Sequence, residues 1–485
     1  MTAASGGAQG LLRGTIQVYL AEMLILPVGL LITAYLTRKL GPEAFGVLSL
    51  ALTLITWIEW SVSSIFARAT FTLVPRAEDW RPLGTTLIRH HLLLSVAMMV
   101  AVWIFSIPAA RALRAPDLAW VLPVLAIDIP LFSLSQAHRN LLIGLGCFKE
   151  RAYASAARWI VRLVLVVLLV ELEFSMMGAV LASIGASAAE FATARLFVRP
   201  SLFAQSSFPP RTLYAFAAPL FVFALVMRLF DKVDLFAVRL LGGTLSQAGA
   251  YSAAQNLSLA PGVFALAFAP LLMAALGRRL ADGDGNGARV VARESMRATL
   301  LLLPFAALVA GAAPAIVVTC FGPSYAAAAP VFAVLVIGAV ALVMVSVATA
   351  ILTVAGKAVL TAILTAPLLP AAVIGHLLLI PRVGPLGASL VTTGLALACA
   401  GAAVSAVYRV WGVAPPSATA LRAAIVSAGA GALARLWTTP GPELVLALAG
   451  GAVAVIIALL LTGEATARER HALRVHSWLA RPPAY

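Results

Sequence analysis

Long apolar runs separated by short polar breaks dominate the chain. A helix that crosses a bilayer needs about 20 largely apolar residues, and fourteen such runs can be read from the sequence. The first run is followed by Thr37, Arg38 and Lys39 and by no small-residue cleavage site, so we interpret it as a helix and not as a signal peptide. The predicted spans are residues 15–36, 45–66, 91–110, 118–141, 152–171, 175–197, 213–236, 248–276, 299–320, 326–350, 358–380, 386–408, 418–438 and 442–462.

Composition agrees with this pattern, because 62% of the residues are apolar, 11% are charged and the mean hydropathy is +1.01. Ordinary soluble proteins carry about 25% charged residues. The net charge of +15 does not indicate nucleic-acid binding, because apolar runs separate the basic residues. Most Lys and Arg outside the spans lie in loops on the side of the two termini, which predicts that both termini are cytoplasmic.

An internal repeat predicts how the spans are organised. Residues 37–41 and 45–51 after the first span match residues 238–242 and 249–254 after the seventh, and Gly146 and Gly178 match Gly356 and Gly387 at nearly the same offset. The period contains an even number of spans, so two six-helix lobes would share one orientation and be related by an axis along the membrane normal. The sequence therefore predicts two pseudo-symmetric lobes, 1–200 and 212–410, two extra helices within 418–462 and a basic cytoplasmic tail, 463–485.

Ionisable residues inside predicted spans are the functional candidates, because charge in a bilayer is costly unless it has a partner or faces a cavity. Arg158 and Arg162 lie four residues apart on one helix face near mid-bilayer. Each guanidinium can donate two hydrogen bonds to phosphate oxygens, so the pair suits a diphosphate. Alternatively, the two cations pair with nearby acids and hold the first lobe together. The acids of the first lobe are Glu22, Glu59, Asp128 and Glu190.

The seventh span carries a second group of charges at helical spacing. Arg228, Asp231, Lys232 and Asp234 are spaced so that cations and carboxylates can pair along the helix. Such a group is either a structural network or a switch whose pairs exchange between two states. In the second case Asp231 or Asp234 would bind H+ or Na+.

No cofactor or metal is expected from the sequence. The three cysteines, Cys147, Cys320 and Cys399, stand singly, which indicates neither a disulfide framework nor a zinc site. A phosphate-binding loop with the pattern G-x-x-x-x-G-K-[ST] is absent, so we do not expect ATP hydrolysis by this chain. We therefore expect that the chain is not an enzyme.

Two segments carry a family resemblance. Residues 40–46, LGPEAFG, and 321–330, FGPSYAAAAP, resemble patterns of the polysaccharide-transporter branch of the multidrug/oligosaccharidyl-lipid/polysaccharide exporter superfamily, the Wzx-type flippases. The resemblance implies two six-helix lobes around a cationic cavity and transport of an undecaprenyl-diphosphate-linked oligosaccharide across the bacterial inner membrane. It also implies Arg158, Arg162, Arg228 and Lys232 as substrate-binding residues, with coupling through Asp231 and Asp234. Glu22, Glu59 and Asp128 are further candidates for coupling because they are acids inside predicted spans of the first lobe.

Three functions follow as alternatives. The first is a flippase for polysaccharide biosynthesis, whose partners would be the lipid-linked oligosaccharide, membrane lipids, a polysaccharide polymerase and glycosyltransferases. The second is a cation-coupled multidrug antiporter of the same superfamily, which would need an acidic and aromatic cavity, whereas Arg predominates here. The third is a membrane glycosyltransferase or O-antigen ligase, which would need a large periplasmic loop, and no long loop separates the predicted spans.

Overall fold

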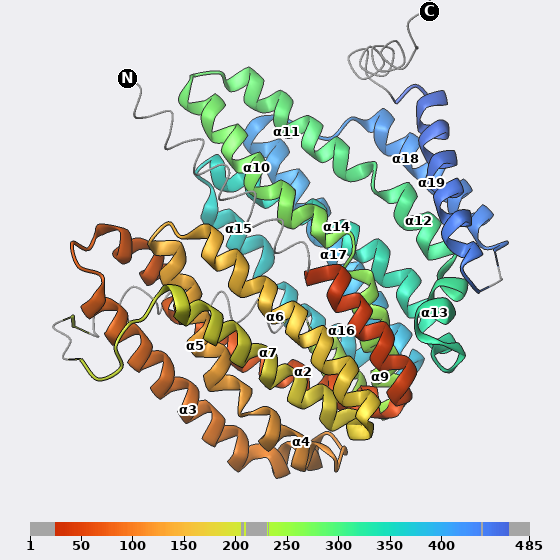
Figure 1. Cartoon of the computed structure of the whole chain (residues 1–485). Coiled ribbons are helices and arrows are strands. Elements are labelled where there is room, and N and C mark those ends of the chain that lie inside the picture. The colour runs from red at the N-terminus through yellow and green to blue at the C-terminus, as the bar shows by residue number, and fades with distance from the viewer. Residues whose placement is uncertain (1–24, 205–207, 210–229, 231, 438–439, 465–485) are drawn as a thin grey trace, which may run out of the picture. The chain divides into compact units, whose positions relative to one another are not determined.

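Helices make up nearly all of the described chain. The computed structural model describes residues 25–204, 208–209, 230, 232–437 and 440–464 (Figure 1). Within these ranges no residue is in a strand. In lipid a helix satisfies its backbone hydrogen bonds within its own segment, which an open sheet edge cannot do. The all-α fold class is confirmed.

Internal contacts divide the chain into two compact units. Unit 1 comprises residues 1–257 and 368–391, and unit 2 comprises residues 258–367 and 392–485. The predicted lobe boundaries at 200, 212 and 410 stay a prediction. Unit 1 contains α2 (Ile25–Leu73), α3 (Arg81–Ala112), α4 (Leu118–Leu125), α5 (Asp128–Gly144), α6 (Phe148–Leu169), α7 (Ser175–Phe197), nearly all of α9 (Leu245–Ser258), and α16 (Leu368–Val383).

Unit 2 contains most of the helices that follow α9, and its last two helices form the C-terminal pair. The helix α17 (Pro385–Trp411) begins in unit 1 and continues in unit 2. Unit 2 further contains α10 (Gly262–Ala281), α11 (Gly285–Leu300), α12 (Leu303–Gly311), α13 (Ala313–Phe321), α14 (Ala329–Val354), α15 (Ala358–Thr365), α18 (Ser417–Ala434) and α19 (Glu443–Leu461).

Ten helical segments of the described ranges are long and apolar enough to cross a membrane. Two of these segments each contain two predicted spans, because Pro27–Ala67 joins the first two and Phe148–Phe197 joins the fifth and sixth. Most of the predicted span 213–236 and the beginning of span 15–36 lie outside the described residues. The predicted span 248–276 has no counterpart among the ten segments, so the joined, undescribed and absent spans account for the difference from fourteen.

Four predicted spans are broken into two helices each. The breaks separate α4 from α5, α9 from α10, α12 from α13, and α15 from α16. A proline stands within three residues after or immediately before the start of the second helix in each case, where its missing N–H and fixed φ angle favour a helix start over a helix interior. The prolines are Pro130, Pro261, Pro314 and Pro367. Periodicity alone did not predict these breaks.

The first two predicted spans form one kinked helix, α2. Gly41 adopts φ 74° and ψ 172° inside it, and Pro42 follows. Positive φ is accessible to glycine at little cost, and Pro42 cannot donate the hydrogen bond that would continue the first half. The sequence Gly-Pro therefore sets the position of the kink.

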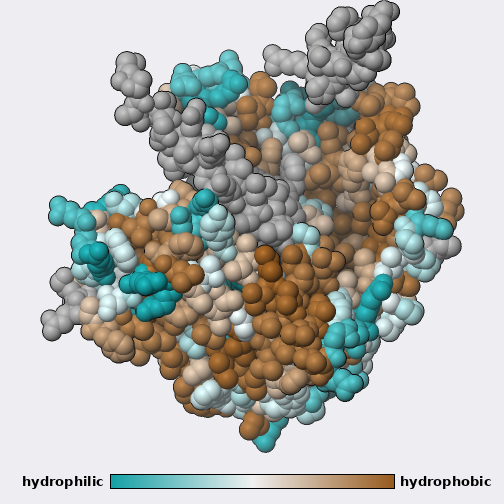
Figure 2. All heavy atoms as spheres, viewed as in Figure 1, coloured by the Kyte–Doolittle hydropathy of each residue, from teal (hydrophilic) through white to brown (hydrophobic). Residues whose placement is uncertain are grey.

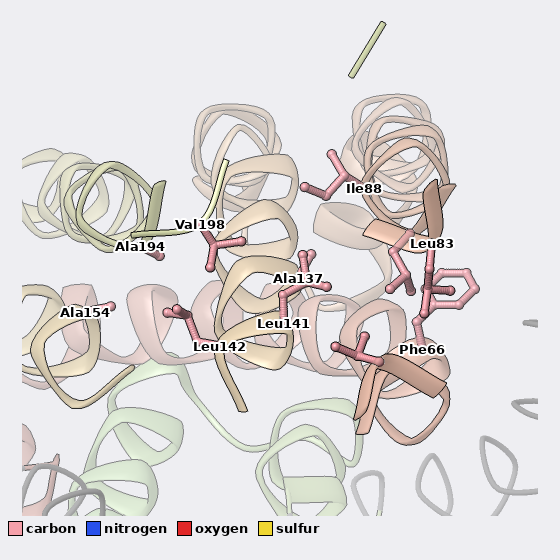
Figure 3. Packing of buried hydrophobic residues seen from close by; sticks show 11 residues of the cluster. Phe66, Leu83, Ile88, Ala137, Leu141, Leu142, Ala154, Ala194 and Val198 are labelled. Carbon is pink, nitrogen blue, oxygen red and sulfur yellow. The ribbon is translucent and has the colours of Figure 1, made fainter. Parts of the chain in front are cut away.

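Unit 1 has an apolar core that joins five helices. Its members include Phe66 of α2, Leu83 of α3, Leu141 of α5, Ala154 of α6 and Ala194 of α7, which are at most 2% exposed (Figure 3). Burial of each large side chain stabilises a fold by roughly 1.5–3 kcal/mol in water. In a bilayer the same contacts act through close packing, because lipid tails are as apolar as leucine.

The outer surface carries many exposed leucines. Leu436, Leu446 and Leu461, on or beside the C-terminal pair α18 and α19, are 73%, 76% and 82% exposed. In Figure 2 hydrophobic residues cover broad areas of the surface, and hydrophilic residues gather on the hairpin of α10 and α11. Such large apolar areas are rare on soluble monomers and are expected where lipid is the solvent. The chain is a multi-pass membrane protein.

Two glycines that the internal repeat aligns contact each other within unit 1. A Cβ atom on Gly249 of α9 would lie 2.0 Å from the carbonyl oxygen of Pro42, and one on Gly46 of α2 would lie 2.1 Å from the carbonyl oxygen of Leu245. Small residues allow the backbones of membrane helices to approach closely. The repeated glycines thus form the crossing of α2 and α9.

We predict that Gly249→Ala destabilises the protein by about 1–3 kcal/mol, because the added methyl group would force the two backbones apart. The measurement is the melting temperature of the purified protein in detergent. Gly277→Ala in α10 is the control, because a Cβ at Gly277 meets nothing within 4 Å. Equal melting temperatures for Gly249→Ala and wild type would contradict the close crossing.

A buried carboxylate after the end of α19 ties the C-terminal helix pair to α11. Glu464 is 6% exposed and accepts hydrogen bonds from Arg297 Nε at 2.7 Å, Thr419 Oγ1 at 2.5 Å and Arg422 Nη1 at 3.0 Å. Burial by itself would raise the pKa of Glu464, but the hydrogen bonds from Arg297, Thr419 and Arg422 outweigh it and lower the pKa below its ordinary value. The ionised carboxylate therefore stabilises the folded state.

This lowered pKa predicts a pH-dependent stability. The stabilisation is fully present above the unfolded pKa of about 4.5 and is lost as the pH falls through the depressed folded pKa. We expect the melting temperature of wild type to fall toward that of Glu464→Gln as the pH is lowered through this window. At neutral pH Glu464→Gln should cost on the order of 3 kcal/mol, because Arg297 loses its buried partner.

Glu294→Gln is the matched control. Glu294 also pairs with Arg297, at 2.8 Å, but its side chain is 51% exposed, and exposed ion pairs contribute about 0–1 kcal/mol. If Glu294→Gln and Glu464→Gln lowered the melting temperature equally, the carboxylate of Glu464 would not be what stabilises the packing of the C-terminal helix pair on α11.

Candidate substrate and coupling site

A buried carboxylate on α7 neutralises two arginines from neighbouring helices. Glu190 is fully buried, and its two oxygens accept from Arg139 Nη1 of α5 and Arg158 Nη1 of α6, each at 2.9 Å. Ser135 Oγ donates to the same carboxylate at 3.0 Å. The pairing that was left open for Arg158 is thus resolved in favour of Glu190. The position of Glu190 in an apolar helix was the signal, but its two partners could not be assigned without the fold.

The guanidinium of Arg158 also lies over an aromatic ring. Its Cζ atom is 4.5 Å from the ring centroid of Phe132 on α5, within the range of a cation–π contact. On the same helix Phe132 lies one turn after Asp128, one turn before Gln136 and two turns before Arg139. The helix α5 therefore presents an aromatic and an ionic contact to α6.

Two further carboxyl groups lie near these arginines. Glu59 of α2 and Asp128 of α5 are each 3% exposed. They interact with each other and with Arg158 and Arg162. Oε1 of Glu59 and Oδ1 of Asp128 have no hydrogen-bond partner within the described residues. The two acids expected from the sequence are thus brought together at the two expected cations.

Arg162 differs from Arg158 in having no ion pair within the described ranges. It lies one turn further along α6, is half-buried, and its Nε atom has no hydrogen-bond partner there. The Cζ atom is 5.7 Å from the ring centroid of Trp159. Arg158, Asp128 and Glu59 are the charged groups with which Arg162 interacts. Arg162 is therefore the cation that this cluster leaves available for an anion.

The charges of the seventh span meet polar residues of α9. Lys232 Nζ donates to Gln255 Oε1 at 2.6 Å and to Asn256 Oδ1 at 3.2 Å. Asp234, 1% exposed, accepts from Tyr251 at 2.6 Å and from Gln255 Nε2 at 3.0 Å. The amide of Gln255 therefore bridges Lys232 and Asp234.

Sequence reasoning missed the contribution of α9. Tyr251 and Gln255 stand four residues apart in α9, and this spacing puts both side chains on one face. That pattern could have identified them as partners of an intramembrane charge. Three of the expected site residues, Glu22, Arg228 and Asp231, lie outside the described residues.

Comparison with known proteins places the chain in a family. The polysaccharide biosynthesis protein family matches residues 11–276. The chain belongs to this family. Within unit 1 the match covers both charge clusters just described, including all of α2, α5, α6, α7 and α9.

One curated relative of this chain is named as a transport protein. The succinoglycan biosynthesis transport protein ExoT of Rhizobium meliloti (strain 1021) is 28% identical over 312 residues. The match covers 62% of this chain and 60% of ExoT. The chain therefore aligns with somewhat more than half of that protein.

Solved structures share the fold. The lipid II flippase MurJ in an inward closed conformation has a TM-score of 0.74, 12% identity, and covers 93% of this chain and 98% of MurJ. An inward-facing multidrug resistance MATE family transporter of the MOP superfamily has a TM-score of 0.64, 14% identity, and covers 86% and 98%. This chain therefore shares the fold of these two proteins.

We predict that Glu190→Gln destabilises the protein by about 3–5 kcal/mol, because it leaves Arg139 and Arg158 buried with one neutral partner. The measurement is the melting temperature in detergent. Glu171→Gln is the control, because Glu171 pairs with Lys39 at 2.8 Å and its side chain is 53% exposed. A loss no larger than that of Glu171→Gln would show that the Glu190 pairs do not stabilise unit 1.

Proposed function

We propose that this protein is a flippase that moves an undecaprenyl-diphosphate-linked oligosaccharide from the cytoplasmic to the periplasmic leaflet of the bacterial inner membrane by alternating access. Membership of the polysaccharide biosynthesis protein family supports a role in building a glycan. The transport name of ExoT and the flippase name of MurJ support movement across a membrane. The charged residues of unit 1 support a diphosphate as the substrate group.

The observation that carries the proposal is Arg162. A half-buried guanidinium without an ion pair in the described part of the chain is costly in a bilayer. Arg158 forms an ion pair with Glu190, but Arg162, one turn further along the same helix, forms no ion pair within the described residues. An anionic substrate would supply the missing charge.

A diphosphate fits the spacing of the two arginines. Arg162 lies one turn beyond Arg158, so their guanidiniums lie on one face of α6. Nη1 is the one nitrogen of Arg158 that hydrogen-bonds within the described residues, so the rest of its planar fork is free to bind oxygen. Hydrogen bonds to charged groups contribute about 1.5–3 kcal/mol each. Lys232, and Arg228 outside the described residues, are the further cations of the proposed site.

Coupling to an ion gradient is the second part of the proposal. Glu59 and Asp128 are buried together, and two carboxyls that share a site readily hold one proton between them. Uptake of a proton would make the cluster more positive, and release would make it more negative. Binding of the diphosphate and binding of the proton would therefore favour each other. Na+ is the other candidate ion.

The proposed setting follows from the same reasoning. Both termini would lie in the cytoplasm, where lipid-linked oligosaccharides are assembled by glycosyltransferases, and a polysaccharide polymerase would use the product in the periplasm. The lipid-facing leucines of α18 and α19 would contact membrane lipids.

We predict that Arg162→Gln lowers surface polysaccharide by about 10–100-fold, which corresponds to the loss of one charge-assisted contact of 1.5–3 kcal/mol. The amount of surface polysaccharide in Arg162→Lys should lie between that of wild type and that of Arg162→Gln, because lysine keeps the charge but not the planar fork. The measurement is surface glycan and accumulated undecaprenyl-diphosphate-linked oligosaccharide in a strain whose own copy is deleted and replaced by each variant.

Arg289→Gln, on an exposed position of α11, is the control at equal protein level in the membrane. Normal surface glycan in Arg162→Gln would overturn the role of this residue. Unchanged glycan in the deletion strain together with increased sensitivity to a cationic dye would overturn the flippase and support a multidrug antiporter.

A further inference from the structure

Unit 2 contains an apolar groove with a volume of about 550 Å³. Its walls come from α12, α14, α17 and α18 (Figure 1). Seven of the twelve lining residues are alanine or glycine, and Arg435 is the one charged residue among them. Ala428 and Ala432 of the α18 wall are exposed, so the groove opens at the protein surface. Ligand pockets measure roughly 300–1,000 Å³, and the groove therefore has the size of a ligand site.

Close helix contacts keep the groove from collapsing. A Cβ atom on Gly311 of α12 would overlap the carbonyl oxygen of Gly431 on α18. A Cβ atom on Gly338 of α14 would lie 2.6 Å from Thr393 Oγ1 on α17. Small residues let membrane helices approach closely, so the members of each pair are already in contact. Because α12 also packs on α14, the four helices form a fixed frame around the groove.

The hydroxyl groups that line the groove already have partners. Ser427 Oγ donates to the carbonyl oxygen of Ala423 at 2.6 Å, and Thr393 Oγ1 donates to that of Val334 at 3.1 Å. A bound water needs about two to four polar partners. Apart from these two residues and Arg435, the lining consists of alanine, glycine, valine and isoleucine. The groove therefore suits an apolar occupant and not a row of waters or a sugar.

Arg435 provides the polar end of the groove. It directly follows Ser417–Ala434, one of the helices that are long and apolar enough to cross a membrane. Its side chain has no ion pair or hydrogen bond within the described residues. The C-terminal end of a helix favours a cation, but this effect leaves the N–H donors of the guanidinium available. Arg435 therefore offers a positive charge where the phosphates of membrane lipids lie.

The groove extends through about one lipid leaflet. Along α18 the lining residues run from Ser427 to Arg435, and eight residues of helix rise about 12 Å. The hydrocarbon core of a bilayer is about 30 Å thick, so one leaflet contributes about 15 Å. An acyl chain that starts at a phosphate beside Arg435 can therefore follow the whole groove within its own leaflet.

We propose that the groove binds one anionic phospholipid, with an acyl chain along its alanines and glycines and the phosphate on Arg435. A phosphodiester carries one negative charge, which one guanidinium matches through two parallel hydrogen bonds. A diphosphate carries more charge than a single arginine neutralises, so the groove differs from the site proposed at Arg158 and Arg162. An apolar helix of a second copy would fill the groove but would supply no anion for Arg435.

A lipid in this groove would stabilise the protein. It would contact α18, the first helix of the C-terminal pair, together with α12, α14 and α17. A ligand that binds only the folded state raises stability by mass action. The melting temperature in detergent should therefore rise when the lipid is added. This inference goes beyond the proposed function and does not depend on it.

The experiment titrates phosphatidylglycerol into the full-length protein in detergent. Native mass spectrometry counts the bound lipids, and the melting temperature is measured at the same lipid concentrations. Wild type should retain one phosphatidylglycerol more tightly than any other and should melt at a higher temperature with it. Ala333→Phe, which fills the groove from α14, and Arg435→Gln should each weaken this binding at least about tenfold and remove the rise. Ala432→Phe provides a second test if Ala333→Phe does not fold.

Two variants serve as matched controls. Ala398→Phe adds the same ring at an exposed position of α17 that does not line the groove. Arg382→Gln removes an exposed cation from the last turn of α16. Both variants should retain phosphatidylglycerol as wild type does.

Four results would overturn the inference. One is unchanged retention of phosphatidylglycerol by a folded groove variant, Ala333→Phe or Ala432→Phe. Another is unchanged retention by Arg435→Gln. A third is displacement of the retained phosphatidylglycerol by an equal concentration of undecaprenyl diphosphate, which would assign the groove to the transported lipid. The fourth is a wild-type dimer that Ala432→Phe separates, which would assign the groove to a second copy. None of these measurements depends on glycan transport.

Discussion

Charge inside the bilayer is the constraint on which the rest of unit 1 depends. Transferring an isolated guanidinium or carboxylate into hydrocarbon costs several kcal/mol or more, so each must be met by a partner from another helix. Glu190 satisfies this requirement for α5, α6 and α7 at once, because one carboxylate receives Arg139, Arg158 and Ser135. The mutual positions of three helices are thereby fixed by one residue, and Arg158 is held where α2 and α5 bring Glu59 and Asp128 to it.

This arrangement has an uneven outcome that suits transport. A purely structural network would neutralise every cation, but Arg162 is left with no ion pair within the described residues. This site lacks an anion. Sites that are incomplete in one state and completed by a ligand are what alternating access requires, because the ligand then shifts the balance between states.

The sequence predicted the fold class and most helices, because hydropathy is a direct consequence of the bilayer as solvent. It identified Arg158, Arg162, Glu59 and Asp128 as candidates for the same reason, since charges are conspicuous in apolar helices. It could not predict that Glu190 forms an ion pair with Arg158 and not with Arg162, because this pairing depends on how α6 is rotated against α7. Nor could it predict the breaks between α15 and α16 or the role of Gln255, since neutral polar residues are common in membrane helices. The internal repeat aligned Gly46 with Gly249, but it did not predict that these two glycines contact each other.

The central claim is that Arg162 binds the diphosphate of a lipid carrier. It is tested most directly by titrating undecaprenyl diphosphate and undecaprenyl monophosphate into the wild-type protein and Arg162→Gln in nanodiscs, with the fluorescence of Trp159, whose ring lies beside the guanidinium of Arg162, as the signal. The account predicts that wild type binds the diphosphate at least about tenfold more tightly than the monophosphate, which corresponds to 1.4 kcal/mol, and that Arg162→Gln removes this preference. Equal affinities of wild type for the two lipids, or an unchanged preference in Arg162→Gln, would contradict it.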